Sequence, residues 1–182
     1  MAPAWTHPHI FIDYTLTIVF DDDGFAGVRT EWIFDEMFSA ASIPNYDVNK
    51  DNILDAEEIE NIKKKAFVNL QHHNYFLYLV DRGNEIQVHH IENFSASIVG
   101  YRLKYSFFIP IRISAKNKKK AITLAFYDES FYVDMLLLDY EPINFEDSEA
   151  IKHSHKVVSN YEEGPYYGQG PRTEIWLKFQ KN

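Results

Sequence analysis

The stretch from His9 to Phe34, HIFIDYTLTIVFDDDGFAGVRTEWIF, decides the fold class of this chain. Its first part, up to Phe20, alternates apolar and polar residues and is rich in β-branched side chains, a pattern typical of a strand. Asp21–Gly24 supplies turn residues, and Gly27–Phe34 repeats the strand pattern. The stretch therefore predicts a β-hairpin at the start of a sheet.

Further strands are predicted downstream, because the same two-residue alternation returns several times. Two of these strands flank Arg82-Gly83-Asn84, which is predicted to be a hairpin turn. The basic run Lys118–Lys120 is interpreted as a solvated hairpin tip, with an interaction patch as the alternative. The predicted strands are Phe76–Asp81, Glu85–His90, Phe94–Val99, Tyr101–Ser114, Ala121–Tyr127, Phe131–Tyr140 and Glu174–Gln180.

Two helices are predicted between the first hairpin and the later strands. A short helix begins after Asp35, a candidate N-cap, and is limited by Pro44. A stronger helix spans Ala56–Leu70, where apolar residues recur at helical spacing. We therefore expect one α+β domain over residues 1–182. Its body is a mainly antiparallel β-sheet or sandwich, with a helical insertion at about 35–75 and a polar tail at about 146–171.

The composition limits the class of protein. The chain has 182 residues, 46% of them hydrophobic, which is enough to bury the core of a domain. The formal net charge of -9 argues against nucleic-acid binding, and the absence of cysteine excludes disulfides, thiol nucleophiles and Cys-ligated zinc. No apolar run approaches the roughly 20 residues of a membrane span, and the first residues contain no signal-peptide core. The protein is expected to be either cytosolic or exported with its signal peptide removed.

The segment Asp47–Glu58, DVNKDNILDAEE, matches the twelve-residue calcium-binding loop of an EF-hand. Ca²⁺ prefers six to eight oxygen ligands, and an oxygen donor occurs here at each position that such a loop requires. The alternative interpretation is an acidic surface turn that binds nothing. The donors are the side chains of Asp47, Asn49, Asp51, Asp55 and Glu58 and the backbone carbonyl of Ile53.

One position of this loop departs from the usual pattern. Asn52 stands where Gly is preferred, because the residue there has to adopt a left-handed backbone conformation. Asn is the best substitute for Gly in that conformation, so we expect weaker Ca²⁺ binding rather than loss of the site. Because a single loop of this kind occurs, a structural role that clips the fold together is favoured over calcium sensing.

Histidine is a good ligand for Zn²⁺ and other divalent transition metals, and the chain has eight histidines. His7 and His9 form the best candidate pair, because an extended segment would point both rings to one face; the alternative is an ordinary surface strand start. Asp128 is either the cap of a turn or a carboxylate that joins this pair in a metal site. The weaker candidates are Asp13 near the pair and His153 and His155 in the polar, mobile tail.

Four motifs occur in a fixed order over roughly residues 7–140 and together resemble the bacterial DUF1007 family. This sequence departs from the family pattern at Asn52, where Gly is usual, and at Glu129, where family members often carry Pro. The motifs are His7-Pro8-His9-Ile10-Phe11-Ile12-Asp13, Trp32-x-Phe34-Asp35-Glu36-x-Phe38-Ser39, the loop Asp47–Glu58, and Tyr127-Asp128-x-x-Phe131-Tyr132.

The resemblance implies an exported, periplasmic protein, because family members usually carry a signal peptide that ends just before the His-Pro-His segment. The family is known as a periplasmic component of an uncharacterised ABC-type transport system, and its members often lie beside nickel/cobalt-type membrane transporters. This context implies a metal-binding accessory protein of divalent metal transport or homeostasis. We expect Ca²⁺ in the loop and Zn²⁺ or another transition metal at His7 and His9.

Two other functions compete with this one. The first is a calcium-stabilised interaction module that docks on a membrane transporter and holds no transition metal. The second is an enzyme, which is disfavoured because no Ser-His-Asp order, phosphate loop or spaced pair of catalytic carboxylates stands out. The sequence thus predicts a binding protein with metal ions and a membrane transporter as its partners.

Overall fold

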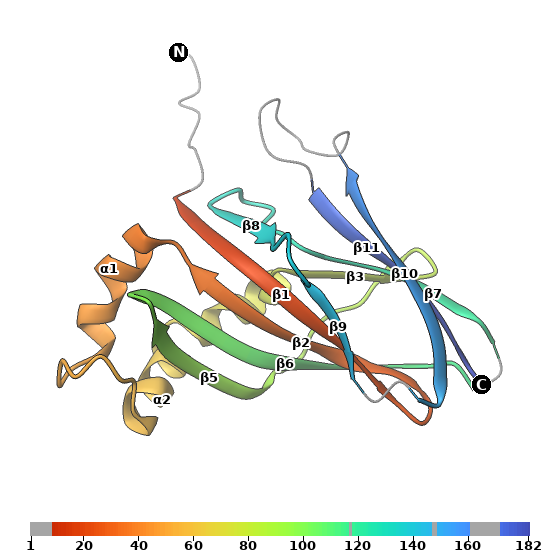
Figure 1. The fold of residues 1–182 in the computed structure, drawn as a ribbon, viewed down its shortest axis with the longest axis horizontal. Coiled ribbons are helices and arrows are strands. Elements are labelled where there is room, and N and C mark those ends of the chain that lie inside the picture. The colour runs from red at the N-terminus through yellow and green to blue at the C-terminus, as the bar shows by residue number, and fades with distance from the viewer. Residues whose placement is uncertain (1–8, 117, 147–148, 161–171) are drawn as a thin grey trace, which may run out of the picture.

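The computed structural model describes residues 9–116, 118–146, 149–160 and 172–182. Two β-sheets pack against each other as a sandwich, and the helices lie together at one end of it (Figure 1). Most strand pairs are antiparallel. The predicted α+β class with a mainly antiparallel body is therefore confirmed.

The larger sheet contains the hairpin that opens the chain. Its strands are β1 (Ile10–Asp21), β2 (Gly24–Phe34), β5 (Glu92–Val99), β6 (Arg102–Ser114), β8 (Val133–Leu137) and β9 (Ile143–Glu146). Their order is β5-β6-β2-β1-β8, and β9 also pairs with β1. β1 and β2 pair as predicted, with Ile12 opposite Phe34 and Asp21 opposite Gly24. β8 and β9 run parallel to β1, an arrangement that the sequence does not reveal.

The smaller sheet corrects two predictions. Its strands are β3 (Leu77–Asp81), β4 (Asn84–Glu85), β7 (Lys120–Phe126), β10 (Ile151–Asn160) and β11 (Arg172–Lys181), in the order β10-β11-β7-β3-β4. Because β6 and β7 belong to different sheets, Lys118–Lys120 is not a hairpin tip but part of a crossover between the sheets. The predicted polar tail is also wrong in part, because Ile151–Asn160 is a strand that pairs along β11. Residues 161–171 of that tail lie outside the described residues.

Of the predicted strand Glu85–His90, only Glu85 lies in a strand, the two-residue β4, because the side chain of Asn74 binds the backbone that follows. The amide of Asn74 donates to the carbonyl of Ile86 at 3.3 Å, and its oxygen accepts the N–H of Val88 at 2.5 Å. Asn74 itself has a left-handed φ of 54°. One asparagine thus satisfies the backbone that a longer strand would have paired.

The helical insertion comprises α1 (Glu36–Tyr46), α2 (Ala56–Lys65) and the 3₁₀ segment η1 (Phe67–Phe76). Asp35 caps α1 as predicted, since its carboxylate accepts the N–H of Phe38 at 2.8 Å. α1 continues past Pro44, contrary to prediction, because proline removes one donor while the N–H of Asp47 still reaches Ile43. The second predicted helix ends at Lys65 instead of Leu70, where the chain tightens into η1.

Aromatic side chains fill the space between the sheets. Trp32 is fully buried, and its ring lies 4.8 Å from that of Phe107 and 5.9 Å from that of Phe126. Phe67 of η1 also packs against Phe107, with ring centroids 4.8 Å apart. The helical insertion is therefore anchored in the same core as the strands.

Candidate functional site

The loop Asp47–Glu58 joins α1 to α2 at the end of the sandwich that carries the helices (Figure 1). Leu54 points into the core with an exposed fraction of 7%, as the predicted anchor of the loop should. Within the loop there are five acidic residues and one lysine, Lys50. Its charge is therefore strongly negative.

Glu58 closes the loop on itself. It is buried, with 7% of its surface exposed, although it carries a carboxylate. One oxygen accepts the N–H of Val48 at 2.7 Å, and the other accepts the N–H of Asp55 at 3.0 Å. The last residue of the loop thus reaches back to its second residue, which brings the ends of α1 and α2 together.

The other carboxylates and amides of the loop bind backbone N–H groups next to them. Asp47, which is 4% exposed, accepts from Asp51 at 3.2 Å and from Asn52 at 3.0 Å. Asn49 accepts the N–H of Asp51 at 3.0 Å. Asn52 has a φ of 62°, so the left-handed conformation predicted at this position is confirmed.

The donor set fits a hard divalent cation, although the arrangement of the side chains does not test binding. All the donors are oxygens, and their charges exceed what the single lysine neutralises. Over the described ranges, no group of three or more His, Cys, Asp or Glu side chains is gathered like a set of metal ligands. In the loop this agrees with carboxylates that are turned toward backbone N–H groups. Calcium binding there stays a prediction.

The N-terminal histidine site is described only in part, because His7 lies outside the described residues. The backbone N–H of His9 donates to the carbonyl of Tyr132 at 2.9 Å, and the two rings are 5.0 Å apart. Asp128 belongs to the same corner but caps its own turn: its carboxylate accepts from the N–H of Ser130 at 2.9 Å and of Val133 at 3.0 Å. The turn-cap interpretation of Asp128 is confirmed, and a metal there stays a prediction.

Asp13 and the pair His153 and His155 lie in different parts of the structure. Asp13 forms an ion pair with Arg102 at 2.8 Å. The prediction that the two histidines lie in a mobile tail is wrong, because both belong to β10. There the ring of His153 stacks on that of Phe145 in β9, with centroids 4.0 Å apart. Burial and the neighbouring His155 lower the pKa of His153. These rings join the edges of the two sheets.

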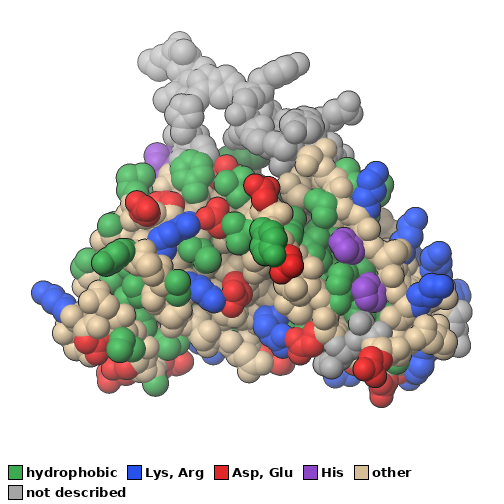
Figure 2. All heavy atoms as spheres, in the orientation of Figure 1, with side chains coloured by type: hydrophobic (Ala, Val, Ile, Leu, Met, Phe, Trp, Pro, Cys, Tyr) green, Lys and Arg blue, Asp and Glu red, His purple; other side chains and the backbone are tan. Residues whose placement is uncertain are grey.

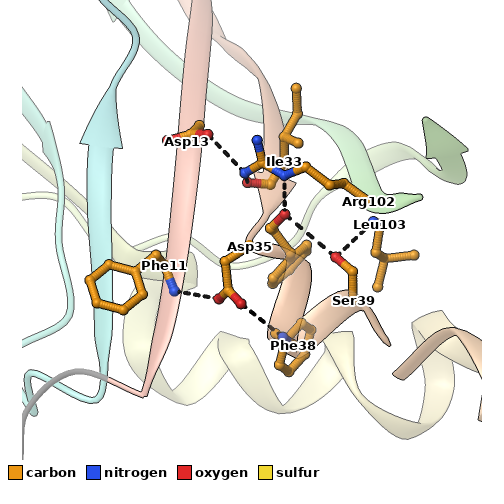
Figure 3. A network of polar contacts seen from close by, with 9 residues as sticks. Phe11, Asp13, Ile33, Asp35, Phe38, Ser39, Arg102 and Leu103 are labelled. Atoms are coloured by element: carbon orange, nitrogen blue, oxygen red, sulfur yellow. Dashed lines mark hydrogen bonds and ion pairs between the residues drawn. The ribbon is translucent and has the colours of Figure 1, made fainter. Parts of the chain in front are cut away.

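A partly buried polar network explains the second family motif (Figure 3). Asp35 accepts the N–H of Phe11 at 2.8 Å in addition to capping α1. Ser39 is fully buried and accepts the N–H of Leu103 at 2.9 Å. Arg102 donates to the carbonyl of Phe34 at 2.6 Å. The roles of Ser39 and Arg102 were not predicted from the sequence, because their partners are 64 and 68 residues away. The sequence signal for Ser39 is a polar residue inside a mostly apolar stretch.

Charge on the sheet surface is largely neutralised by ion pairs. Lys104 lies 2.7 Å from Glu31, and Arg29 pairs with Glu146. Figure 2 shows basic and acidic side chains next to one another across the middle of the face in view. The uncompensated acidity of the loop between α1 and α2 is therefore a local property.

Comparison with known proteins gives a family and two relatives of unknown function. The family described as "Protein of unknown function (DUF1007)" matches residues 1–164. An "Uncharacterized protein" of Haemophilus influenzae is 28% identical over 141 residues, which is 76% of this chain and 66% of that protein. An "Uncharacterized 15.5 kDa protein in trpE 3'region" of Spirochaeta aurantia is 28% identical over 127 residues, 70% of this chain and 90% of that protein. No helix in the part of the chain that the structure describes could span a membrane.

Proposed function

Because this chain belongs to the DUF1007 family, whose function is unknown, we propose its function from its own residues: it is a non-enzymatic binding protein that holds one Ca²⁺ in the loop Asp47–Glu58. The observation that carries the proposal is the closed loop between α1 and α2. Two carboxylates, Asp47 and Glu58, are buried in it, and Asn52 adopts the left-handed conformation that the calcium-loop pattern requires.

Calcium would act in this loop mainly on stability. Five carboxylates occur within the twelve residues of the loop, and like charges repel each other unless a cation neutralises them. An ion that binds only the folded loop adds about 2.7 kcal/mol to the free energy of unfolding when its concentration is 100 times the Kd. The side chains of Asp47, Asn49, Asp51, Asp55 and Glu58 and the carbonyl of Ile53 would hold it. The ion would thus clip the helical insertion to the sandwich.

The test is thermal unfolding of the chelated protein with and without Ca²⁺. We expect saturating Ca²⁺ to raise Tm by several degrees, roughly 5–10 °C for a domain of this size. Glu58→Gln should lose most of this rise, because a neutral amide is a poor substitute for the bidentate carboxylate. Glu57→Gln is the matched control, since Glu57 is exposed, carries the same charge and is not a predicted ligand. An equal rise in both variants would refute the proposed site.

We further propose that the protein is exported to the periplasm and serves divalent metal transport, as the family resemblance implies. In this role His7 and His9, with Asp128, would bind Zn²⁺ or another transition metal. The hydrogen bond between His9 and Tyr132 supports the juxtaposition, because it brings His9 to the turn that Asp128 caps. Titration of Zn²⁺ into the double variant His7→Ala, His9→Ala should show at least tenfold weaker binding than the parent. The matched control is His89→Ala, His90→Ala, which should bind like the parent.

A second candidate function keeps the calcium site and omits the transition metal. The protein would then be a calcium-stabilised module that docks on a membrane transporter. Three groups donate to the carboxylate of Asp128: the N–H and the hydroxyl of Ser130 and the N–H of Val133. They favour this candidate, because a metal would have to displace some of these donors. Elemental analysis of the protein purified from its host separates the two: calcium without zinc, nickel or copper supports the docking module.

A further inference from the structure

A cavity of about 300 Å³ lies away from the calcium-loop candidate, beside η1 and the paired strands β3 and β7. This volume is at the lower end of the range typical of small-molecule sites. Its wall combines histidine, tyrosine and acidic side chains. The lining residues that matter here are His72, His73, Tyr78, Glu85, Tyr127 and Glu129.

The charge of the lining is negative. Glu85, Asp128 and Glu129 all line the cavity, and its lining within the described residues contains no lysine or arginine. The carboxylate of Asp128 is held by its own turn, whereas Glu85 and Glu129 are exposed and can turn toward a ligand. Burial raises the pKa of Tyr127, the guanidinium of Arg172 opposes this rise, and the carboxylates of Glu129 and Glu85 add to it. A cation in the cavity would therefore meet favourable charges.

The aromatic part of the wall already contacts a cation. The rings of Tyr78 and Tyr127 lie 5.6 Å apart, and the guanidinium of Arg172 lies 4.6 Å and 4.9 Å from their centroids. Arg172 is also ion-paired with Glu174, so its own charge is compensated. Guanidinium groups stack on tyrosine faces and bind carboxylates in a bidentate way. The ring faces toward Arg172 are occupied, but the contact shows that these two tyrosines can hold a guanidinium group, and carboxylates line the cavity beside them.

The side chains around the cavity do not form a ready-made set of metal ligands within the described residues. Although histidines and carboxylates line the cavity, they are not gathered as metal ligands, because no such group of three exists among the residues that the structure places. A planar organic cation does not need three ligands gathered around one point, since it makes stacking contacts and hydrogen bonds over a wider area. We propose that this cavity binds a guanidinium group, either the arginine side chain of a partner protein or a free alkylguanidine.

Isothermal titration with N-acetyl-arginine amide tests the proposal, and N-acetyl-citrulline amide is the uncharged control of the same shape. The arginine amide should bind with a Kd of about 1 mM, and the citrulline amide should bind at least tenfold more weakly. The double variant Glu85→Gln, Glu129→Gln should weaken binding of the arginine amide about fivefold with an unchanged Tm, because both side chains are exposed. Glu60→Gln on α2 removes a charge far from the cavity in sequence and should bind like the parent.

The proposal would be overturned if the arginine and citrulline amides bound equally well. It would also be overturned if neither bound at about 20 mM, a concentration well above the expected Kd of ~1 mM. The two sources of the group are separated by acetyl-Gly-Arg-Gly amide and agmatine. Tighter binding of the peptide assigns the site to a partner's arginine, and tighter binding of agmatine assigns it to a free guanidine. The titration is repeated with Ca²⁺ and with chelator. Binding of the arginine amide should be the same in both, so a failure of the proposed calcium loop would not affect this result.

Discussion

Two polar segments, one at the start of α1 and one after its end, use their side chains in opposite ways. Asp35 and its neighbour Ser39 bind groups in β1 and β6, so their hydrogen bonds join distant parts of the chain. In the loop Asp47–Glu58, the side-chain hydrogen bonds among the described residues stay within the loop and span at most ten residues. The first segment therefore holds the sandwich and α1 together without a ligand. The second segment keeps an excess of negative charge, which under our proposal a bound cation neutralises.

The largest effect is expected from Asp35→Ala, which removes the N-cap of α1 and the acceptor for the N–H of Phe11. Loss of a cap and of one further hydrogen bond should lower the free energy of unfolding by about 2–3 kcal/mol. Urea unfolding should show the same loss with Ca²⁺ and with chelator. Glu36→Ala, at an exposed neighbouring position, is the control. A loss that appears only in the presence of Ca²⁺ would contradict the division between the two segments.

A smaller effect is expected at Asn52, the residue at which the loop departs from the calcium-loop pattern. Its φ of 62° is unstrained for glycine, so Asn52→Gly should tighten Ca²⁺ binding about threefold. Asn52→Ala should weaken it, because alanine is disfavoured in this conformation. Calcium titrations of the two variants measure the effect. If alanine bound Ca²⁺ as tightly as glycine does, the backbone conformation would not control affinity.

The smallest effect is expected at His153, which lies outside both segments, where the edges of the two sheets meet. It concerns the pH dependence of stability. Burial and His155 hold the pKa of His153 below its ordinary value of 6.5, so the unfolded chain takes up a proton more readily. The contribution of His153 to stability is therefore complete above about pH 6.5 and is lost as the pH falls toward its folded-state pKa.

His153→Phe should reduce the fall in Tm between pH 7 and pH 5, because phenylalanine keeps the stack on Phe145 without binding a proton. The exposed His89 supplies the control, since His89→Phe should leave the pH dependence of Tm unchanged. Identical pH profiles for the parent and His153→Phe would show that the ring at this position does not contribute to acid sensitivity.

The parts of the fold that follow from local chemistry could be predicted. The β1–β2 hairpin follows from the alternation of side chains, the start of α1 from the cap Asp35, and the turn at Asp128 from its Ser130 and Val133 donors. In each case the deciding contacts lie close together in the sequence, where propensity and pattern act.

The parts that depend on distant partners could not be predicted. β10 has mostly exposed side chains, so its polar sequence does not alternate, and only pairing with β11 makes it a strand. The passage from β6 to β7 looks like a hairpin because the sequence does not show that the two strands join different sheets. Ser39 and Arg102 bind groups more than 60 residues away, which no local pattern indicates.

Direct titration of Ca²⁺ into the chelated protein tests the central claim most directly. We predict one bound Ca²⁺ per chain, with binding that Mg²⁺ does not match at the same concentration, because the loop offers more oxygens than the smaller ion can use. A chain that binds no Ca²⁺ at millimolar concentration, judged by heat and by equilibrium dialysis, would show that the loop between α1 and α2 is an acidic turn.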